Sequence, residues 1–228
     1  MHFEVERLPN GELLEKMKYG IVGLLQPERV LDILQHFVVF ERDNGEIIKK
    51  VARYQQLRAA NKIVERVVHT DKKQGVIWHT QGSGKSLTML YTAYKLRKAT
   101  ELNDPTVYLV VDRKDLKDQM SDTFLDCVFP NARQVMNVGD LKSIIKGKPA
   151  GVYITTIQKF DELGSISDER DNVVVLIDEA HRTEYGDYQM ELRAVLPNAR
   201  RFAFTGTPIP KTHREFGIKG EDGKMEYY

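Results

Sequence analysis

One stretch in the first half of the chain constrains the fold more than any other. Val76, Ile77 and Trp78 form a short apolar run that predicts a buried strand, and the residues from Ser86 to Arg97 predict a helix. A glycine-rich bend connects the two. A strand, a glycine-rich bend and a helix in this order are the setting that a phosphate-binding loop requires. The stretch therefore predicts a phosphate site between a sheet and a helix.

The residues of this loop suit phosphate chemically. Gly82 and Gly84 lack a Cβ atom, so the backbone is free to point successive N–H groups into one concavity. The following helix adds its unpaired amides and the positive end of its dipole. Lys85 would bring a full charge to the β- and γ-phosphates, and Ser86 would bring a hydroxyl for Mg²⁺.

One position departs from the general phosphate-loop pattern, G-x-x-x-x-G-K-[ST]. Counting back from Gly84 places His79 where that pattern has its first glycine. On these residues alone, the alternative is a glycine-rich turn before an ordinary helix, because short motifs give false matches. The rest of the chain has to decide between the two interpretations.

Downstream of the loop, apolar runs alternate with helical patterns. The predicted strands are 106–111, 133–138, 152–156, 173–177 and 201–205, and the predicted helices are 115–127, 139–146 and 188–196. This alternation predicts an α/β domain with a mostly parallel sheet and helices on both faces. The polar segment 161–171 is expected to be a solvent-exposed loop. Ligands of such sheets bind at the carboxyl ends of the strands.

The ends of the chain are expected to lie outside this domain, which would span 51–210 and begin with a helix over 52–68. Residues 1–50 predict a small accessory segment, the tail of an upstream domain, with helical patterns over 12–25 and from Pro27 onwards. A hairpin is predicted over 37–51, because Asp43-Asn-Gly45 is a tight-turn signal. The polar residues 211–228 are expected to be a linker.

Composition limits the possible partners and location. The net charge of the 228 residues is +1, so any DNA binding must come from local basic patches. Cys127 is the only cysteine, which excludes an internal disulfide and a cysteine-based metal cage. The N-terminus does not resemble a secretory signal, and the longest apolar runs are too short to span a bilayer. We expect a cytoplasmic protein without a membrane segment.

A pair of acids follows the most apolar predicted strand, 173–177. Asp178 at this strand end would hold Mg²⁺, usually through water, and Glu179 next to it would polarise an attacking water. The alternative is a pair of solvated loop acids. That alternative requires the phosphate loop, the buried strand and the acids to occur in one sheet by accident.

Two glutamines precede the phosphate loop, on the predicted helix 52–68. A glutamine side chain both donates and accepts hydrogen bonds, which suits the N6 and N7 edge of adenine. Gln56 is our candidate for this contact and Gln55 is its rival. The alternative for either is an ordinary surface position on a helix.

Three sequences, in this order, resemble motifs I, II and III of superfamily 2 helicases and translocases: 80–86, 178–181 and 204–208. A residue other than glycine at position 79 is ordinary in that superfamily. Within it, the chain is similar to the motor (R) subunit of type I restriction-modification enzymes. The similar sequences are W-H-T-Q-G-S-G-K-S at 78–86, V-V-D-R-K-D-L at 110–116, T-T-I-Q-K-F at 155–160, D-E-A-H-R at 178–182 and R-Y-Q-Q-L-R-A-A-N-K-I at 53–63. The resemblance covers roughly residues 50–210.

The resemblance implies a RecA-like P-loop NTPase lobe with motifs Q, I, Ia, Ib, II and III, which uses ATP and Mg²⁺. The implied ATP-binding residues are Gln56, His79, Thr80, Gln81, Gly82, Ser83, Gly84, Lys85 and Ser86. Ser86 and Asp178 would hold Mg²⁺, and the implied catalytic residues are Lys85, Asp178, Glu179 and His181. His181, Thr205 and Thr207 would couple nucleotide state to DNA grip, and Arg113 and Thr156 would contact DNA phosphates.

Structural alternatives stay open for several of these residues. His181 would equally serve as a core histidine at a helix N-terminus, and Thr205 and Thr207 as caps of a strand end. Arg113 would equally pair with a neighbouring aspartate, because a phosphate contact needs only a basic and accessible group.

The family pattern further implies translocation of double-stranded DNA in a complex with methyltransferase and specificity subunits. Two family features are not found in this chain: a second lobe with its arginine finger, and a nuclease pattern within residues 1–50. We therefore expect a fragment that binds ATP·Mg²⁺ weakly and turns it over poorly alone. The alternative functions are a DNA-repair or remodelling helicase lobe of the same superfamily, and a nucleotide-binding regulatory module without activity of its own.

Overall fold

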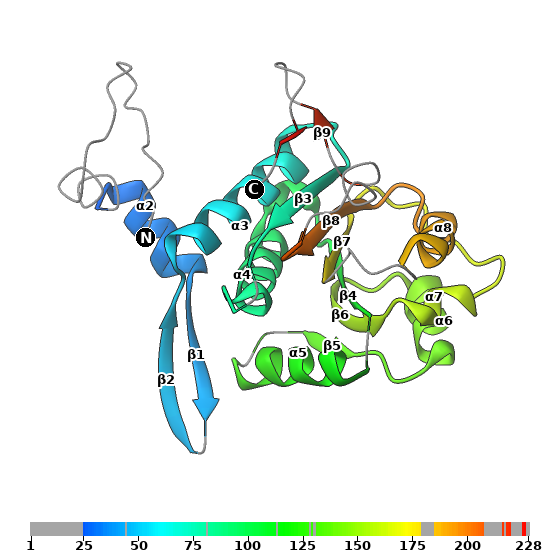
Figure 1. The fold of residues 1–228 in the computed structure, drawn as a ribbon, viewed down its shortest axis with the longest axis horizontal. Helices are drawn as coiled ribbons and strands as arrows, with labels where there is room; N and C mark the ends of the chain where they lie inside the picture. The colour runs from blue at the N-terminus through cyan, green and yellow to red at the C-terminus, as the bar shows by residue number, and fades with distance from the viewer. Residues whose placement is uncertain are drawn as a thin grey trace.

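A six-stranded sheet forms the centre of the molecule (Figure 1). The computed structural model describes residues 25–43, 45–80, 82–112, 114–127, 129, 131–178, 185–207, 216, 218–219 and 225–226. The strands of the sheet are β3 (Gln74–Trp78), β4 (Thr106–Val111), β5 (Ala132–Gln134), β6 (Gly151–Thr156), β7 (Val173–Asp178) and β8 (Arg200–Thr205). Their order is β3-β8-β7-β4-β6-β5, and every neighbouring pair is parallel. The predicted α/β class is confirmed.

Helices cover both faces of the sheet, as expected for parallel strands. They are α3 (Tyr54–His69), α4 (Lys85–Lys98), α5 (Lys114–Asp126), α6 (Val138–Gly147), α7 (Gln158–Asp161) and α8 (Tyr185–Val195), with a short 3-10 turn at Thr100–Leu102. Apolar residues of α3, α4 and α5 share one core cluster with the sheet. Those of α6, α7 and α8 share the other.

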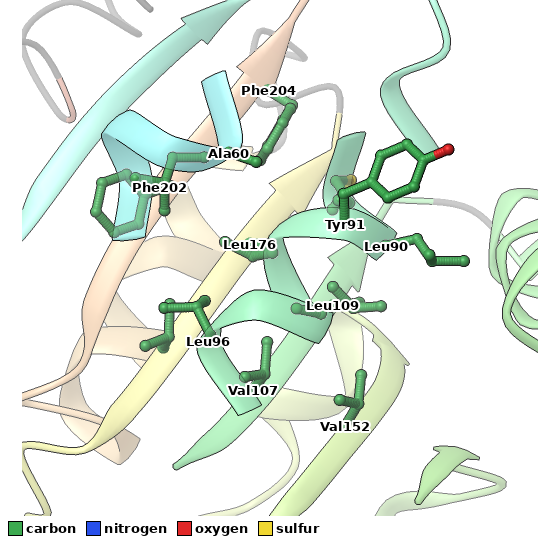
Figure 2. Close-up of a cluster of buried hydrophobic side chains, with 14 of the residues drawn as sticks. Ala60, Leu90, Tyr91, Leu96, Val107, Leu109, Val152, Leu176, Phe202 and Phe204 are labelled. Atoms are coloured by element: carbon green, nitrogen blue, oxygen red, sulfur yellow. The ribbon is translucent and has the colours of Figure 1, made fainter. Parts of the chain in front are cut away.

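Alternation along the strands produces these two cores. On β4, Leu109 joins the cluster of α3, α4 and α5, while its neighbours Tyr108 and Val110 join the opposite cluster. Figure 2 shows the first cluster, where Leu90 and Leu96 of α4 lie over the strands. Because β4, β6 and β7 are buried along their whole length, their sequences are mostly apolar. This explains why the strands were visible in the sequence.

The N-terminal described segment contains α2 (Pro27–His36) and an antiparallel hairpin of β1 (Val38–Asp43) and β2 (Glu46–Val51). Proline begins α2, as predicted. The hairpin extends away from the central sheet (Figure 1). Asp32 connects the segment to the domain, because its carboxylate contacts Lys95 of α4 and accepts a hydrogen bond from Asn61 of α3 at 3.1 Å.

The expectation of a solvent loop over 161–171 is wrong in part. The segment has no regular structure beyond Asp161, and most of its residues are exposed. However, Leu163 and Asp168 are buried. Asp168 is fully buried because Arg170 binds both of its carboxylate oxygens, with Nε at 3.0 and 3.1 Å. A charged side chain can be buried when a partner satisfies it, and no sequence pattern indicates this pairing.

Few residues beyond position 207 are described. Phe216 is buried in the cluster shared with α6, α7 and α8. Two short strands, β9 (Ile218–Lys219) and β10 (Met225–Glu226), pair antiparallel. The division of the chain into 1–50, 51–210 and 211–228 stays a prediction. In the described part of the chain, no helix has both the length and the apolarity needed to cross a bilayer.

Candidate nucleotide-binding site

Three neighbouring strands bring the sequence motifs to one edge of the sheet. β8 lies between β3 and β7, with Trp78 opposite Thr205 and Asp178 opposite Phe204. All three strands run in the same direction, so the loop after β3, the acid that ends β7 and the turn after β8 leave the sheet together. This is the edge at which α/β sheets bind ligands.

The loop after β3 has the backbone of a phosphate cradle. Gly82 and Gly84 adopt φ values of +77° and +84°, which side chains with a Cβ rarely adopt. Helix α4 begins directly afterwards at Lys85, so its first amides face the loop. Ser83 carries a buried hydroxyl that has no hydrogen-bond partner among the described residues. Such an unsatisfied group suits an anionic ligand, so the loop fits a nucleotide phosphate.

A divalent cation fits the same edge by the chemistry of its donors. Ser86 lies in the first turn of α4, and Asp178 is the buried last residue of β7. A hydroxyl and a carboxylate are the oxygen ligands that Mg²⁺ takes beside substrate phosphates. These two residues would hold the ion.

His79 is buried at the base of the loop and is bonded to the sheet. Its backbone N–H donates to the Thr205 carbonyl at 3.0 Å, and its ring lies edge-on to Phe204. Its Nδ1 is 3.5 Å from the Thr88 hydroxyl of α4. Burial lowers the pKa of His79, and the charge of Lys85 lowers it further. The imidazole is therefore neutral near pH 7.

Gln56 lies beneath the loop at the start of α3. It is buried, whereas the neighbouring Gln55 is exposed. Its Oε1 accepts a hydrogen bond from the Arg53 N–H at 2.8 Å, and its Nε2 donates to the Gly84 carbonyl at 3.1 Å. Both the oxygen and the nitrogen of the side-chain amide are thus hydrogen-bonded to backbone atoms. The expected contact with adenine stays a prediction.

Thr205 at the end of β8, Thr207 just after it, and Thr156 at the end of β6 lie at the same edge. The hydroxyl of Thr205 accepts the N–H of Thr207 at 3.1 Å, so the strand end closes on itself in a small turn. Thr205 is buried and Thr207 is exposed. Thr156 is the buried last residue of β6. Gln81, Arg113, Glu179 and His181 lie outside the described residues.

Two contributors to this edge were not singled out from the sequence. Thr88 donates its hydroxyl to the Gly84 carbonyl at 3.1 Å, and helix spacing from Gly84 to Thr88 would have indicated this contact. Trp78, about half exposed, donates its indole N–H to the Gly206 carbonyl at 3.2 Å. No sequence pattern indicates the Trp78 contact, because it depends on β8 lying beside β3.

The parallel sheet and the phosphate loop define a P-loop ATPase lobe, and comparison with known proteins gives the family. The chain belongs to the SWI2/SNF2 ATPase family, whose model matches residues 55–222. Among curated proteins it is 41% identical over 214 residues to the "Type I restriction enzyme HindI endonuclease subunit" of Haemophilus influenzae, covering 82% of this chain and 20% of the relative. The chain spans about a fifth of the length of the curated relatives it matches.

Solved structures show the same fold. A fragment of a putative HsdR subunit of a type I restriction enzyme from Vibrio vulnificus superposes with a TM-score of 0.50 at 20% identity, covering 96% of this chain and 38% of that one. The UvsW helicase of bacteriophage T4 superposes with a TM-score of 0.54 at 18% identity, covering 80% and 61%. The predicted RecA-like lobe and the predicted likeness to type I restriction R subunits are confirmed.

Proposed function

We propose that the chain is the ATP-binding lobe of a DNA translocase, which hydrolyses ATP to pump duplex DNA as part of a type I restriction endonuclease. The observation that carries this proposal is the shared sheet edge. It brings together the phosphate loop before Lys85, Asp178 of β7 and the turn after Thr205. Relatives that bear the name of type I restriction endonuclease subunits supply the biological context.

The residues of the edge would divide the work on ATP. The loop 79–86 and Lys85 would bind the phosphates, and Ser86 and Asp178 would hold Mg²⁺. Held by these two residues, Mg²⁺ would neutralise the charge that develops on the phosphates. Glu179 would orient and polarise the attacking water. The adenine contact would fall at the start of α3, where Gln55 and Gln56 lie.

The remaining predicted residues would connect ATP to DNA. His181, Thr205 and Thr207 would couple the nucleotide state to the strength of DNA binding. Arg113 and Thr156 would contact DNA phosphates. Contacts of this kind position a protein on DNA without reading its sequence. We propose that sequence reading and modification belong to partner specificity and methyltransferase subunits, and that the complex works in the cytoplasm.

DNA-stimulated ATP hydrolysis tests the proposal in the complete polypeptide that carries this chain. We expect double-stranded DNA to raise turnover, and Glu179→Gln to lower the stimulated rate by about 10²-fold or more, because general-base groups contribute on that order. Glu65→Gln makes the same chemical change at an exposed position of α3 and is expected to leave the rate unchanged. ATP turnover that ignores both DNA and Glu179→Gln would contradict the proposal.

A further inference from the structure

Trp78 joins the start of the phosphate loop to the turn after β8. Its indole N–H donates to the Gly206 carbonyl at 3.2 Å, and the next residue along the chain is His79, where the loop begins. The His79 N–H donates to the Thr205 carbonyl at 3.0 Å, and the His79 ring lies edge-on to Phe204. Two consecutive residues at the start of the loop therefore contact three consecutive residues of the neighbouring strand and its turn.

The contact of Trp78 with Gly206 differs from the other two in its exposure. His79, Phe204 and Thr205 are buried, whereas the Trp78 side chain is about half exposed. A hydrogen bond at the surface opens at a low cost in free energy, because water replaces the lost partner. The turn can therefore be held or released at Trp78 while the buried contacts of the sheet stay in place.

The side chain of Trp78 lies on the face of the sheet away from α4. Val76 packs in the cluster shared with α6, α7 and α8, and Ile77 packs in the cluster shared with α3, α4 and α5. Alternation along β3 thus places Trp78 on the Val76 side, whereas the phosphate loop leads into α4 on the Ile77 side. The indole therefore acts on the turn and not on the phosphates.

The turn that Trp78 contacts is held together internally. The Thr207 N–H donates to the Thr205 hydroxyl at 3.1 Å, so residues 205–207 form one small unit with the Gly206 carbonyl between them. A displacement of the strand end at Trp78 would accordingly move this unit as a whole.

We propose that Trp78 is a positioning residue that transmits the state of the phosphate loop to the turn 205–207. The inference rests on the proposed function, because it assumes that the loop binds ATP and that the turn responds to DNA. It deepens that function by naming a residue that connects the two. Coupling is a free energy shared between sites, so loss of this connection lowers the effect of DNA on ATP turnover and leaves ATP binding itself intact.

The test measures three quantities in the complete polypeptide: basal ATP turnover, its KM for ATP, and the stimulation of turnover by double-stranded DNA. Trp78→Phe keeps an aromatic ring and removes the N–H donor. We expect the stimulation to fall by about 2- to 10-fold, the range of one hydrogen bond, with basal turnover and KM unchanged. Asn172→Ala removes a side-chain bond to the Leu102 carbonyl at the opposite edge of the sheet, and is expected to leave all three quantities unchanged.

Two results would overturn the inference. One is a Trp78→Phe protein that DNA stimulates as strongly as the parent. The other is a loss of basal turnover or a rise in KM as large as the loss of stimulated turnover, which would make Trp78 a support of the nucleotide site alone. If Trp78→Phe fails to fold in a thermal melt, Trp78→Tyr replaces it, because this larger ring also lacks the indole N–H. A parent whose turnover is not raised by DNA would instead refute the proposed function.

Discussion

At the position where the general phosphate-loop pattern has its first glycine, this chain carries a buried histidine. A glycine there leaves the base of the loop without a side chain, whereas His79 packs on Phe204 and approaches the Thr88 hydroxyl. The imidazole therefore fills the space between β8 and α4. Its neutral state is part of this arrangement, because burial and the charge of Lys85 both disfavour the imidazolium.

The lowered pKa of His79 predicts how stability depends on pH. In the unfolded chain the imidazole returns to its ordinary pKa of 6.5, so the unfolded state binds the proton first. Stability that is present above that pH is lost as the pH falls towards the lower folded pKa. We expect the free energy of unfolding to decline as the pH falls below about 6.5, and to decline less in His79→Gln.

Urea denaturation at a series of pH values measures this difference. The measured quantity is the slope of the free energy of unfolding against pH. A general destabilisation by the substitution shifts the whole curve and does not change this slope. Parallel slopes for the two proteins over the whole window would show that His79 does not titrate as the structure implies.

At the scale of elements, the two ends of the strands carry different features. The carboxyl edge carries the phosphate loop, and the amino edge carries an ion pair. Arg170 binds both oxygens of Asp168 and also donates to Thr106, the first residue of β4, at 3.1 Å. Burial alone would raise the pKa of Asp168, but the bonds to Arg170 outweigh burial and hold the pKa below its ordinary value.

Asp168→Asn is expected to lower the free energy of unfolding at pH 7 by about 2–3 kcal/mol. The substitution removes the negative charge that neutralises Arg170, which keeps its hydrogen bonds to Thr106 and to the Lys148 carbonyl. Arg170 is partly exposed, so the cost stays below that of a fully buried pair. Denaturant unfolding gives the number, and Glu169→Gln, at an exposed neighbour, is the control. Mg·ATP affinity should not change, because the pair lies at the opposite edge. A drop in affinity without a drop in stability would contradict this division.

A second polar cluster joins α2 and the hairpin to the domain. Burial acts to raise the pKa of Asp32, yet its contacts with Lys95, His36 and Asn61 lower it overall. We expect Asp32→Asn to cost about 1 kcal/mol, as for a partly exposed charged contact, and to speed amide exchange in residues 27–51. Hydrogen exchange followed by mass spectrometry measures this, with Glu28→Gln, an exposed acid of α2, as the control. Exchange that is equally slow in both variants would refute the role of the cluster.

The sequence predicted helices and strands better than it predicted which strands pair and which side chains are in contact. The strand 106–111 was predicted with the bounds it has, because a strand buried on both faces is apolar throughout. The strand order was not predictable, since β8 is the last strand of the sheet along the chain and yet lies between β3 and β7. The burial of Asp168 and the hydrogen bond from Gln56 to Gly84 depend on tertiary neighbours, and neither was foreseen. The phosphate loop was recognisable in the sequence because phosphate chemistry restricts residue types and spacing.

At the scale of the whole molecule, one lobe is expected to bind ATP better than it hydrolyses it. Superfamily 2 motors complete their active site with an arginine finger from a second lobe, and such a group is worth about 10³–10⁵ in rate. We expect steady-state ATP turnover by the 228-residue chain to be that much slower than turnover by the complete polypeptide. Phosphate release assays measure both. Comparable rates for the two proteins, abolished in the chain by Lys85→Ala, would contradict the expectation.

Equilibrium binding of Mg·ATP to the chain, measured by calorimetry for the parent and for Lys85→Ala, tests the central claim most directly. If the loop after β3 holds the β- and γ-phosphates, the parent binds one nucleotide, and Lys85→Ala weakens binding about 10-fold or more, because a charge-assisted contact is lost. Equal affinities for the two proteins, or a parent that does not bind Mg·ATP, would contradict the assignment of this sheet edge as a nucleotide site.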